Sequence, residues 1–135
     1  NRVWLDDYCT QVVEAMRGFA GMISVEAEME ALEVDVRVAA PLALILTELL
    51  TNVFKYAFAG RSQGLVSITL ARGEGEARLS VRDDGIGLPP GFDPLTQPGM
   101  GLELIRGLVS QVKGEFSIEG DASGTLAKVS FPLSG

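Results

Sequence analysis

The chain has 135 residues, a length that suits one compact domain whose core needs neither disulfides nor a structural metal. The formal net charge is −7 and the 11 Lys and Arg residues are scattered along the sequence, which argues against a nucleic-acid-binding surface. One cysteine, Cys9, excludes a disulfide framework, and the lack of histidine excludes histidine triads, histidine metal ligands and a phosphoacceptor histidine within these residues.

The cellular setting follows from what the sequence lacks. There is no signal-like start, and no apolar run approaches the roughly 20 residues of a membrane span. A lone cysteine in an apolar helical pattern fits a reducing compartment. We therefore expect a cytoplasmic domain, 1–135, without membrane contact. Because the sequence starts inside a helix-like pattern, we expect it to be a piece of a longer protein.

The amino-terminal third alternates between helical and extended patterns. Apolar residues recur at three- and four-residue spacing over 3–19, which predicts an amphipathic helix that ends near Gly18 to Gly21. Two short segments, 22–26 and 32–36, predict strands joined by an acidic stretch.

The middle of the chain predicts a long helix and then a hairpin. Pro41 is tolerated in a first helical turn, so we expect the helix to begin there, to run to about Phe58 and to be closed by Gly60. Apolar and polar residues then alternate over 66–70 and over 77–82, on either side of a glycine-containing turn. This alternation predicts two antiparallel strands.

The last third predicts a loop, a helix and two strands. Residues 88–98 hold four of the six prolines, which predicts a surface loop. An amphipathic pattern over 102–112 predicts a helix that ends at Gly114. Alternating residues over 116–118 and 127–131 then predict two strands joined by a turn.

The long helix carries a candidate metal and phosphate site. At 100° per residue, Glu48, Asn52 and Lys55 fall on the side opposite the apolar stripe. One interpretation is a solvated helix face with a helical ion pair. The other is a magnesium site, in which Asn52 and Glu48 supply oxygen ligands and Lys55 meets phosphate. An asparagine in mid-helix favours the second interpretation.

Asp83 is a candidate base-recognition residue. The register of inward residues 77, 79 and 81 places Asp83 on the inward face, where an ionised carboxylate needs a hydrogen-bond partner. Alternatively, the strand ends at 82 and Asp83 begins a turn. In the functional interpretation, Asp83 accepts a hydrogen bond from an exocyclic amine such as that of adenine, while Gly85 and Gly87 let the backbone approach the base. Thr125 has the same inward parity.

Gly99, Gly101 and Leu102 stand just before the last predicted helix. Their free backbone N–H groups and the helix N-terminus are candidates to receive phosphate, although a hinge is an equally good interpretation of two glycines. The loop 88–98 would then act as a lid. Tyr56 lies at the edge of the apolar stripe, so both core packing and stacking on a base are open to it.

Together these motifs resemble a known family. The segments at 48–56, 83–87, 99–102 and 124–125 are similar, in order and in the element on which each falls, to the Bergerat ATP-binding fold of gyrase, heat-shock chaperone, mismatch-repair and histidine-kinase ATPases. Within that fold, the sequence from Pro41 to Pro132 resembles the catalytic domain of a sensor histidine kinase subfamily related to the HWE kinases. The Trp-x-Glu element and N-box histidine of the HWE kinases proper are missing.

The resemblance implies a fold and a ligand. The expected fold is α/β, an α+β two-layer sandwich in which helices pack on one face of a mixed β-sheet. The expected ligand is ATP with Mg²⁺. The roles that the resemblance implies are magnesium binding by Asn52, orientation of the accepting imidazole by Glu48, and contacts with phosphate from Lys55 and with the adenine region from Tyr56.

On the other side of the expected pocket, Asp83 would recognise the adenine amine and Thr125 would support that contact through water. The remaining residues, assigned to the base and phosphate walls, are Gly85, Gly87, Gly99, Gly101 and Leu102.

The resemblance also implies partners. The helical hairpin that carries the phosphorylated histidine in such kinases is absent from these residues, so we expect an isolated, mainly monomeric catalytic domain. It would serve a histidine-bearing dimerisation domain of the same kinase, with a response regulator downstream. The alternatives are a serine/threonine kinase of anti-sigma-factor type and a non-catalytic adaptor that docks response regulators.

Overall fold

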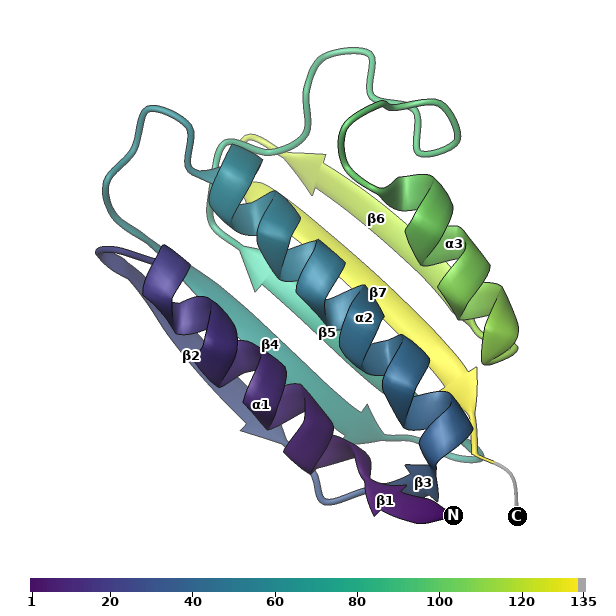
Figure 1. The fold of residues 1–135 in the computed structure, drawn as a ribbon. Coiled ribbons are helices and arrows are strands. Elements are labelled where there is room, and N and C mark those ends of the chain that lie inside the picture. The colour runs from purple at the N-terminus through teal and green to yellow at the C-terminus, as the bar shows by residue number, and fades with distance from the viewer. Residues whose placement is uncertain (134–135) are drawn as a thin grey trace.

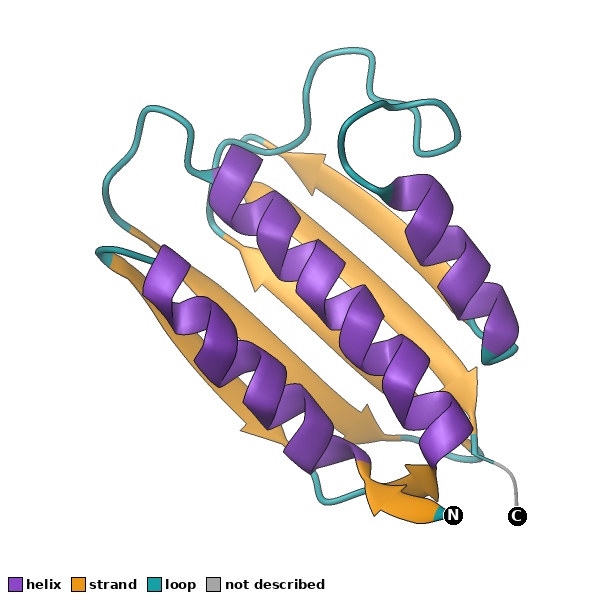
Figure 2. Cartoon of the chain, in the orientation of Figure 1, coloured by secondary structure: helices purple, strands orange, loops and turns teal. Residues whose placement is uncertain are grey.

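The computed structural model describes residues 1–133, so the last two residues of the predicted domain range lie outside it. Helices and strands alternate along the chain, and Figures 1 and 2 show the helices gathered over one face of a sheet. In chain order the elements are β1 (Arg2–Trp4), α1 (Leu5–Met16), β2 (Ile23–Met29), β3 (Glu33–Asp35), α2 (Val36–Asn52), β4 (Gly64–Arg72), β5 (Glu76–Asp83), α3 (Leu102–Gln111), β6 (Glu115–Asp121) and β7 (Gly124–Pro132).

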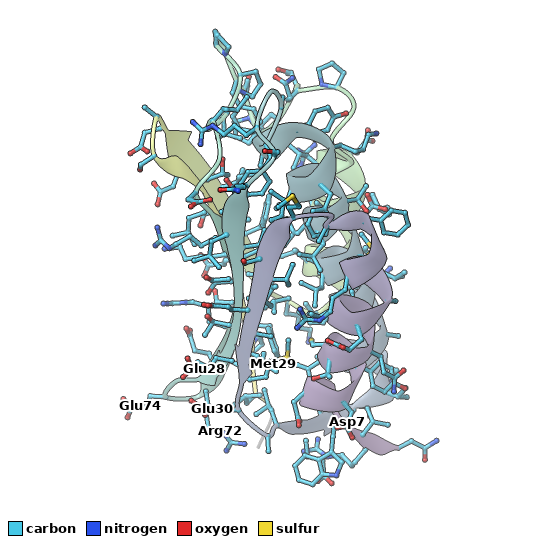
Figure 3. The ribbon with its side chains drawn as sticks, turned by 90° about the vertical axis from the view of Figure 1, so that its left-hand side faces the viewer. Asp7, Glu28, Met29, Glu30, Arg72 and Glu74 are labelled. Atoms are coloured by element: carbon cyan, nitrogen blue, oxygen red, sulfur yellow. The ribbon has the colours of Figure 1, made fainter. Side chains whose placement is uncertain are left out.

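The main sheet has five strands in the order β2-β4-β5-β7-β6. Strands β2 and β4 are parallel, and the other neighbours are antiparallel, so the sheet is mixed. Side chains alternate between its two faces: Figure 3 shows the adjacent Glu28 and Met29 of β2 on opposite sides of the strand. Met29 packs against the core beneath the helices, whereas Glu28 is exposed. The predicted fold class, helices on one face of a mixed sheet, is confirmed.

The amino-terminal predictions need three corrections. Residues 2–4 form β1, so the first helix begins at Leu5 rather than at Val3. Strand β2 runs to Met29, beyond the predicted end at 26, because it pairs along its whole length with β4. The predicted strand 32–36 is shortened to β3, which pairs with β1 in a separate two-stranded sheet rather than joining the main one.

The start of the long helix was also predicted wrongly. Helix α2 begins at Val36, and Pro41 lies inside it. The side chain of Asp35 caps the helix by accepting a hydrogen bond of 2.8 Å from the N–H of Arg37, which allows the helix to begin five residues earlier than expected. The ring of Pro41 removes one hydrogen bond of the helical ladder but is buried against the core. At its other end, α2 continues into a π-helical turn, Val53–Ala57, near the predicted end.

The helix that combines α2 with this turn, Val36–Ala57, has 22 residues and is long and apolar enough to cross a membrane. The expectation from the sequence that no apolar run approaches that length is therefore wrong. Half of the most apolar window of this helix is buried, and its apolar stripe packs on the sheet as the centre of the core. Core packing thus accounts for this apolar character.

The carboxyl-terminal predictions are confirmed. Strands β4 and β5 form the predicted hairpin, with Gly75 at a positive φ of 73° in its turn. Residues 88–98 form a loop without helix or strand, drawn at the top of Figure 1 between β5 and α3. Strands β6 and β7 pair antiparallel, as expected.

Candidate functional site

A cavity of about 570 Å³ lies at the end of the molecule where α2 passes into the π-helical turn. Lining residues come from the sheet, and residues 86–90 and 97–98 line it from the loop between β5 and α3. This volume is in the range of small-molecule sites, and a mostly apolar wall with a few polar groups is typical of them. Five of the residues predicted from the sequence line it: Asn52, Tyr56, Asp83, Gly87 and Thr125.

Asp83 is the last residue of β5, and its side chain points into the layer between sheet and helices. It is 5% exposed, and Val81 before it is also buried, so the predicted inward register is confirmed. Thr125 lies directly opposite Asp83 in the antiparallel pairing of β5 with β7. The N–H of Gly85 donates a hydrogen bond of 2.9 Å to Asp83 Oδ1. The sheet therefore presents a carboxylate and a hydroxyl side by side at the floor of the cavity.

Burial raises the pKa of Asp83 above the ordinary value of 3.8, since the charged form is poorly solvated there. Hydrogen bonding from the backbone of Gly85 and Thr125 acts in the opposite direction, and the charge of Asp84 adds to the increase. A buried carboxyl group with a shifted pKa in a cavity is a frequent mark of a functional site.

Asn52 is the last residue of α2 and is 8% exposed, so it does not belong to a solvated helix face. Its side-chain Nδ2 donates a hydrogen bond of 2.7 Å to the carbonyl oxygen of Met100. Among residues 1–133, Asn52 Oδ1 accepts no hydrogen bond, and none of the buried side-chain oxygens there lacks a partner. Oδ1 is therefore accessible to solvent. An accessible amide oxygen is a suitable ligand for Mg²⁺.

The other two helix residues flank the cavity instead of lining it. Lys55 is exposed, and its Nζ lies 5.4 Å from the centre of the Tyr56 ring. Glu48 is half-buried beside Gly101, where a Cβ atom would come within 2.9 Å of Glu48 Oε2. The structure therefore places Glu48 and Lys55 on either side of Asn52, outside the cavity wall.

The structure gives a reason for glycine at positions 85 and 87 that the sequence did not indicate. A Cβ atom at Gly85 would lie 2.0 Å from the carbonyl oxygen of Ala57, and one at Gly87 would lie 2.1 Å from that of Asp121. The predicted reason was close approach to a base. In the folded chain, backbone atoms of the π-helical turn and of the last residue of β6 also exclude a side chain here, and the close approach to a base stays a prediction.

The segment before α3 is tied to α2. The hydroxyl of Tyr56 donates a hydrogen bond of 2.9 Å to the carbonyl oxygen of Gly99. Gly99 and Gly101 have positive φ values of 83° and 66°, which favour glycine. Leu102 is 2% exposed, so its side chain belongs to the core and only its backbone is available to a ligand.

Several residues that line the cavity were missed from the sequence. Most are apolar or lie in the loop, where periodicity gives no signal of a site; they are Leu49, Val53, Val81, Ile86, Leu88, Gln97, Ile118 and Ala127. Met100 could have been found, because it stands between two glycines that were identified. Within residues 1–133, no three His, Cys, Asp or Glu side chains gather as a metal site.

Comparison with known proteins relates this chain to histidine kinases and similar ATPases. Residues 37–135 match the family model described as histidine kinase-, DNA gyrase B- and HSP90-like ATPase. The blue-light-activated histidine kinase 2 of Erythrobacter litoralis is 31% identical over 115 residues, which cover 84% of this chain and 33% of that protein. Sensor histidine kinase PdtaS of Mycobacterium tuberculosis is 37% identical over 73 residues, which cover 53% of this chain and 15% of that protein.

Solved structures give the same result. A histidine kinase domain from the blue-light activated histidine kinase of Erythrobacter litoralis superposes with a TM-score of 0.91 at 28% identity, over 97% of this chain and 62% of that one. The mycobacterial sensor histidine kinase MprB, at 21% identity, shares the fold with a TM-score of 0.79 over 98% of this chain and 96% of that one. The chain thus spans a third or less of the two curated relatives.

Proposed function

Because this chain belongs to the histidine kinase-, DNA gyrase B- and HSP90-like ATPase family, we propose that it binds Mg²⁺-ATP and donates the γ-phosphoryl group to a histidine on a separate helical dimerisation domain. The observation that carries the proposal is that a buried carboxylate, Asp83, and an accessible amide oxygen, Asn52 Oδ1, line one cavity of about 570 Å³. The two relatives are named as histidine kinases, which supports phosphoryl transfer to histidine and does not favour a serine kinase or an adaptor.

The proposed role of each residue follows from where it lies relative to the cavity. Asp83 accepts a hydrogen bond from the adenine amine, supported by Thr125 opposite it on β7. Asn52 is placed to hold Mg²⁺ through Oδ1, and the metal, when bound, neutralises charge on the phosphates. Gly99, Gly101 and the backbone N–H groups at the start of α3 receive phosphate. Lys55, outside the cavity wall, reaches the phosphates from the helix surface.

In the transfer step, a nitrogen of the accepting imidazole forms a bond to the γ-phosphorus while the bond to the β–γ bridging oxygen breaks. ADP leaves with that oxygen, and the other ring nitrogen of the imidazole loses its proton to water. Glu48, beside Gly101 at the edge of the site, orients that imidazole. The domain supplies position and charge neutralisation, and the partner supplies the nucleophile, because the chain itself contains no histidine.

We propose that the chain is one cytoplasmic domain of a two-component kinase. Its partners would be the histidine-bearing domain of the same kinase and, downstream, a response regulator.

The first test measures ATP binding to the chain by calorimetry. Asp83→Ala removes the group that recognises the adenine amine, so we expect binding to fall by about 100-fold or more, as for a buried polar contact that leaves its partner unpaired. Asp7→Ala, an exposed aspartate on α1, is the matched control and should bind like the original chain. Unchanged affinity in Asp83→Ala would reject this pocket.

The second test follows label from γ-³²P-ATP when the chain is joined to its native upstream segment. Acid-labile, base-stable label on that segment is expected for phosphohistidine. Acid-stable label would favour the serine kinase, and no label despite ATP binding would favour the adaptor. The chain alone should remain unlabelled.

A further inference from the structure

Two hydrogen bonds join the end of α2 to the peptide groups that precede α3. Asn52 Nδ2 donates to the carbonyl of Met100 at 2.7 Å, and the hydroxyl of Tyr56 donates to the carbonyl of Gly99 at 2.9 Å. The two donors are four residues apart, one turn of helix, and the two acceptors are consecutive. The donors therefore hold adjacent peptide groups of one short segment against one face of the helix.

The Met100 contact decides which atom of the Asn52 carboxamide is free. Since Nδ2 is bound to the carbonyl of Met100, the planar amide turns Oδ1 away from that carbonyl, and Oδ1 is the atom accessible to solvent. An outer contact of this kind fixes the orientation of a ligand atom, and its loss typically weakens metal binding by 10- to 100-fold.

The position of the Met100 carbonyl depends in turn on its neighbours. Gly99 and Gly101 flank Met100, both at positive φ, and glycine has little intrinsic preference for one conformation. Without a tether this segment would sample several arrangements. The hydrogen bond from Tyr56 to the preceding carbonyl, Gly99 O, restricts it to one.

The environment of Tyr56 indicates that its hydroxyl has this one task. The side chain is 39% exposed, so core packing does not require it, and its ring lies beside Lys55 Nζ, at 5.4 Å. The contact with Gly99 is close: a Cβ atom on Gly99 would lie 3.2 Å from the Tyr56 hydroxyl oxygen. The family resemblance implies a contact with the adenine region, a role that the ring alone could perform.

We propose that Tyr56 is a positioning residue for the metal ligand: its hydroxyl fixes Gly99, which fixes the Met100 carbonyl, which orients Asn52 Oδ1 toward the cation. The inference deepens the proposed function and rests on it. It assigns to the hydroxyl an effect on the magnesium-dependent part of ATP binding, and none on recognition of the base.

The test compares Tyr56→Phe with the original chain. The variant keeps the ring and its contact with Lys55 and removes only the donor. Affinities for adenosine, for ATP with excess EDTA and for ATP with Mg²⁺ are measured by calorimetry. We expect the gain in affinity that Mg²⁺ confers on ATP to fall about three- to tenfold, the value of one hydrogen bond, with adenosine binding unchanged.

Tyr8→Phe is the matched control. Tyr8 is the only other tyrosine, lies on α1 and packs against the core away from the cavity. It should leave all three affinities unchanged. An equal loss of adenosine and ATP affinity in Tyr56→Phe would overturn the inference, since the hydroxyl would then act on the base. The inference would also be overturned if Mg²⁺ increased the ATP affinity of Tyr56→Phe as much as that of the original chain.

A second measurement needs no nucleotide. The chain has two asparagines, Asn1 and Asn52, so selective ¹⁵N-asparagine labelling gives two side-chain amide signals. We expect the Asn52 signal to move in Tyr56→Phe toward the position of a solvated amide, with faster hydrogen exchange, and the Asn1 signal to stay as an internal reference. An unchanged Asn52 signal would overturn the inference. Failure of the original chain to bind ATP would instead reject the proposed function, leaving this measurement to decide on the tether.

Discussion

At the scale of single residues, Asp83 carries an energetic cost that the fold accepts. The carboxyl group is almost completely buried, and its raised pKa shows that the folded chain stabilises the charged form less well than water does. A buried carboxyl group seldom persists for stability alone, because an apolar or amide side chain would fit without that cost. The cost is consistent with a ligand that adds a hydrogen-bond donor to this carboxyl group.

Asp83→Asn tests this cost through the pH dependence of stability. In the original chain, the folded state keeps the Asp83 proton above the ordinary pKa of 3.8, where the unfolded chain has lost it. The free energy of unfolding should therefore decrease as the pH rises from about 3.8 through the raised pKa. Asparagine cannot ionise and still accepts from Gly85, so this decrease should be absent from Asp83→Asn in urea unfolding across that range.

Asp7→Asn is the control for the loss of one negative charge, since Asp7 is exposed on α1. This variant should retain the slope of the original chain. Identical pH profiles for Asp83→Asn and the original chain would show that burial of Asp83 does not limit stability.

At the scale of elements, the π-helical turn Val53–Ala57 connects the walls of the cavity. Its last carbonyl, Ala57 O, accepts a hydrogen bond of 2.8 Å from the N–H of Ile86. Tyr56 of the same turn holds Gly99 on the other wall. A π-helical turn is rare and is often found at functional sites. Here one irregular turn holds both the segment after β5 and the segment before α3.

Gly85→Ala tests the close approach to this turn. A Cβ atom there would lie 2.0 Å from Ala57 O, a backbone atom that cannot move without disturbing the turn. We expect a loss of about 2 kcal/mol or more in the free energy of unfolding, together with weaker ATP binding. Urea unfolding and calorimetry measure the two effects.

Gly107→Ala is the matched control on α3. Gly107 is exposed, and a Cβ atom there meets no heavy atom within 4 Å. In a helix interior this change should stabilise the chain by about 0.5–1 kcal/mol. If both variants lose stability equally, the steric explanation for Gly85 is wrong.

At the scale of the whole molecule, the packed layers of helices and sheet differ from the loop 88–98 in how much they contribute to the core. The helices cover one face of the sheet, and the core between them is continuous. The loop 88–98 contributes cavity wall but little to the core, with Leu95 70% exposed. Such segments open with the lowest free energy in a domain.

Limited proteolysis tests this division. Chymotrypsin should cut first within 88–98, giving two fragments, because Leu95 is exposed in a segment without regular structure. Mg²⁺-ATP at ten times its Kd should slow this cut roughly tenfold if bound nucleotide holds the loop. The protection should disappear in Asp83→Ala. First cleavage elsewhere, or protection that survives in Asp83→Ala, would contradict the assignment of the loop as a lid.

Regular elements with a clear period were predictable from the sequence because the pattern itself states which face is buried. The hairpin of β4 and β5, the loop and the last two strands agree with their predictions, and the inward position of Asp83 follows from the two-residue period alone. Errors occurred where partners distant in sequence decide. Strand β3, for example, pairs with β1 rather than with the main sheet. The error at helix α2, which begins at Val36 rather than at Pro41, has a local cause instead, namely the capping hydrogen bond that Asp35 accepts from the N–H of Arg37.

The sequence by itself determined the fold class, the family resemblance and the residue types available for nucleotide binding, since these depend on local period and on motifs in chain order. Only the tertiary structure decided that Asn52 binds the carbonyl of Met100, that Tyr56 binds that of Gly99 and that Gly85 meets Ala57, because each contact joins segments about 30 to 50 residues apart. Which atom of a side chain remains free for a ligand is settled by such contacts, and no local pattern encodes them.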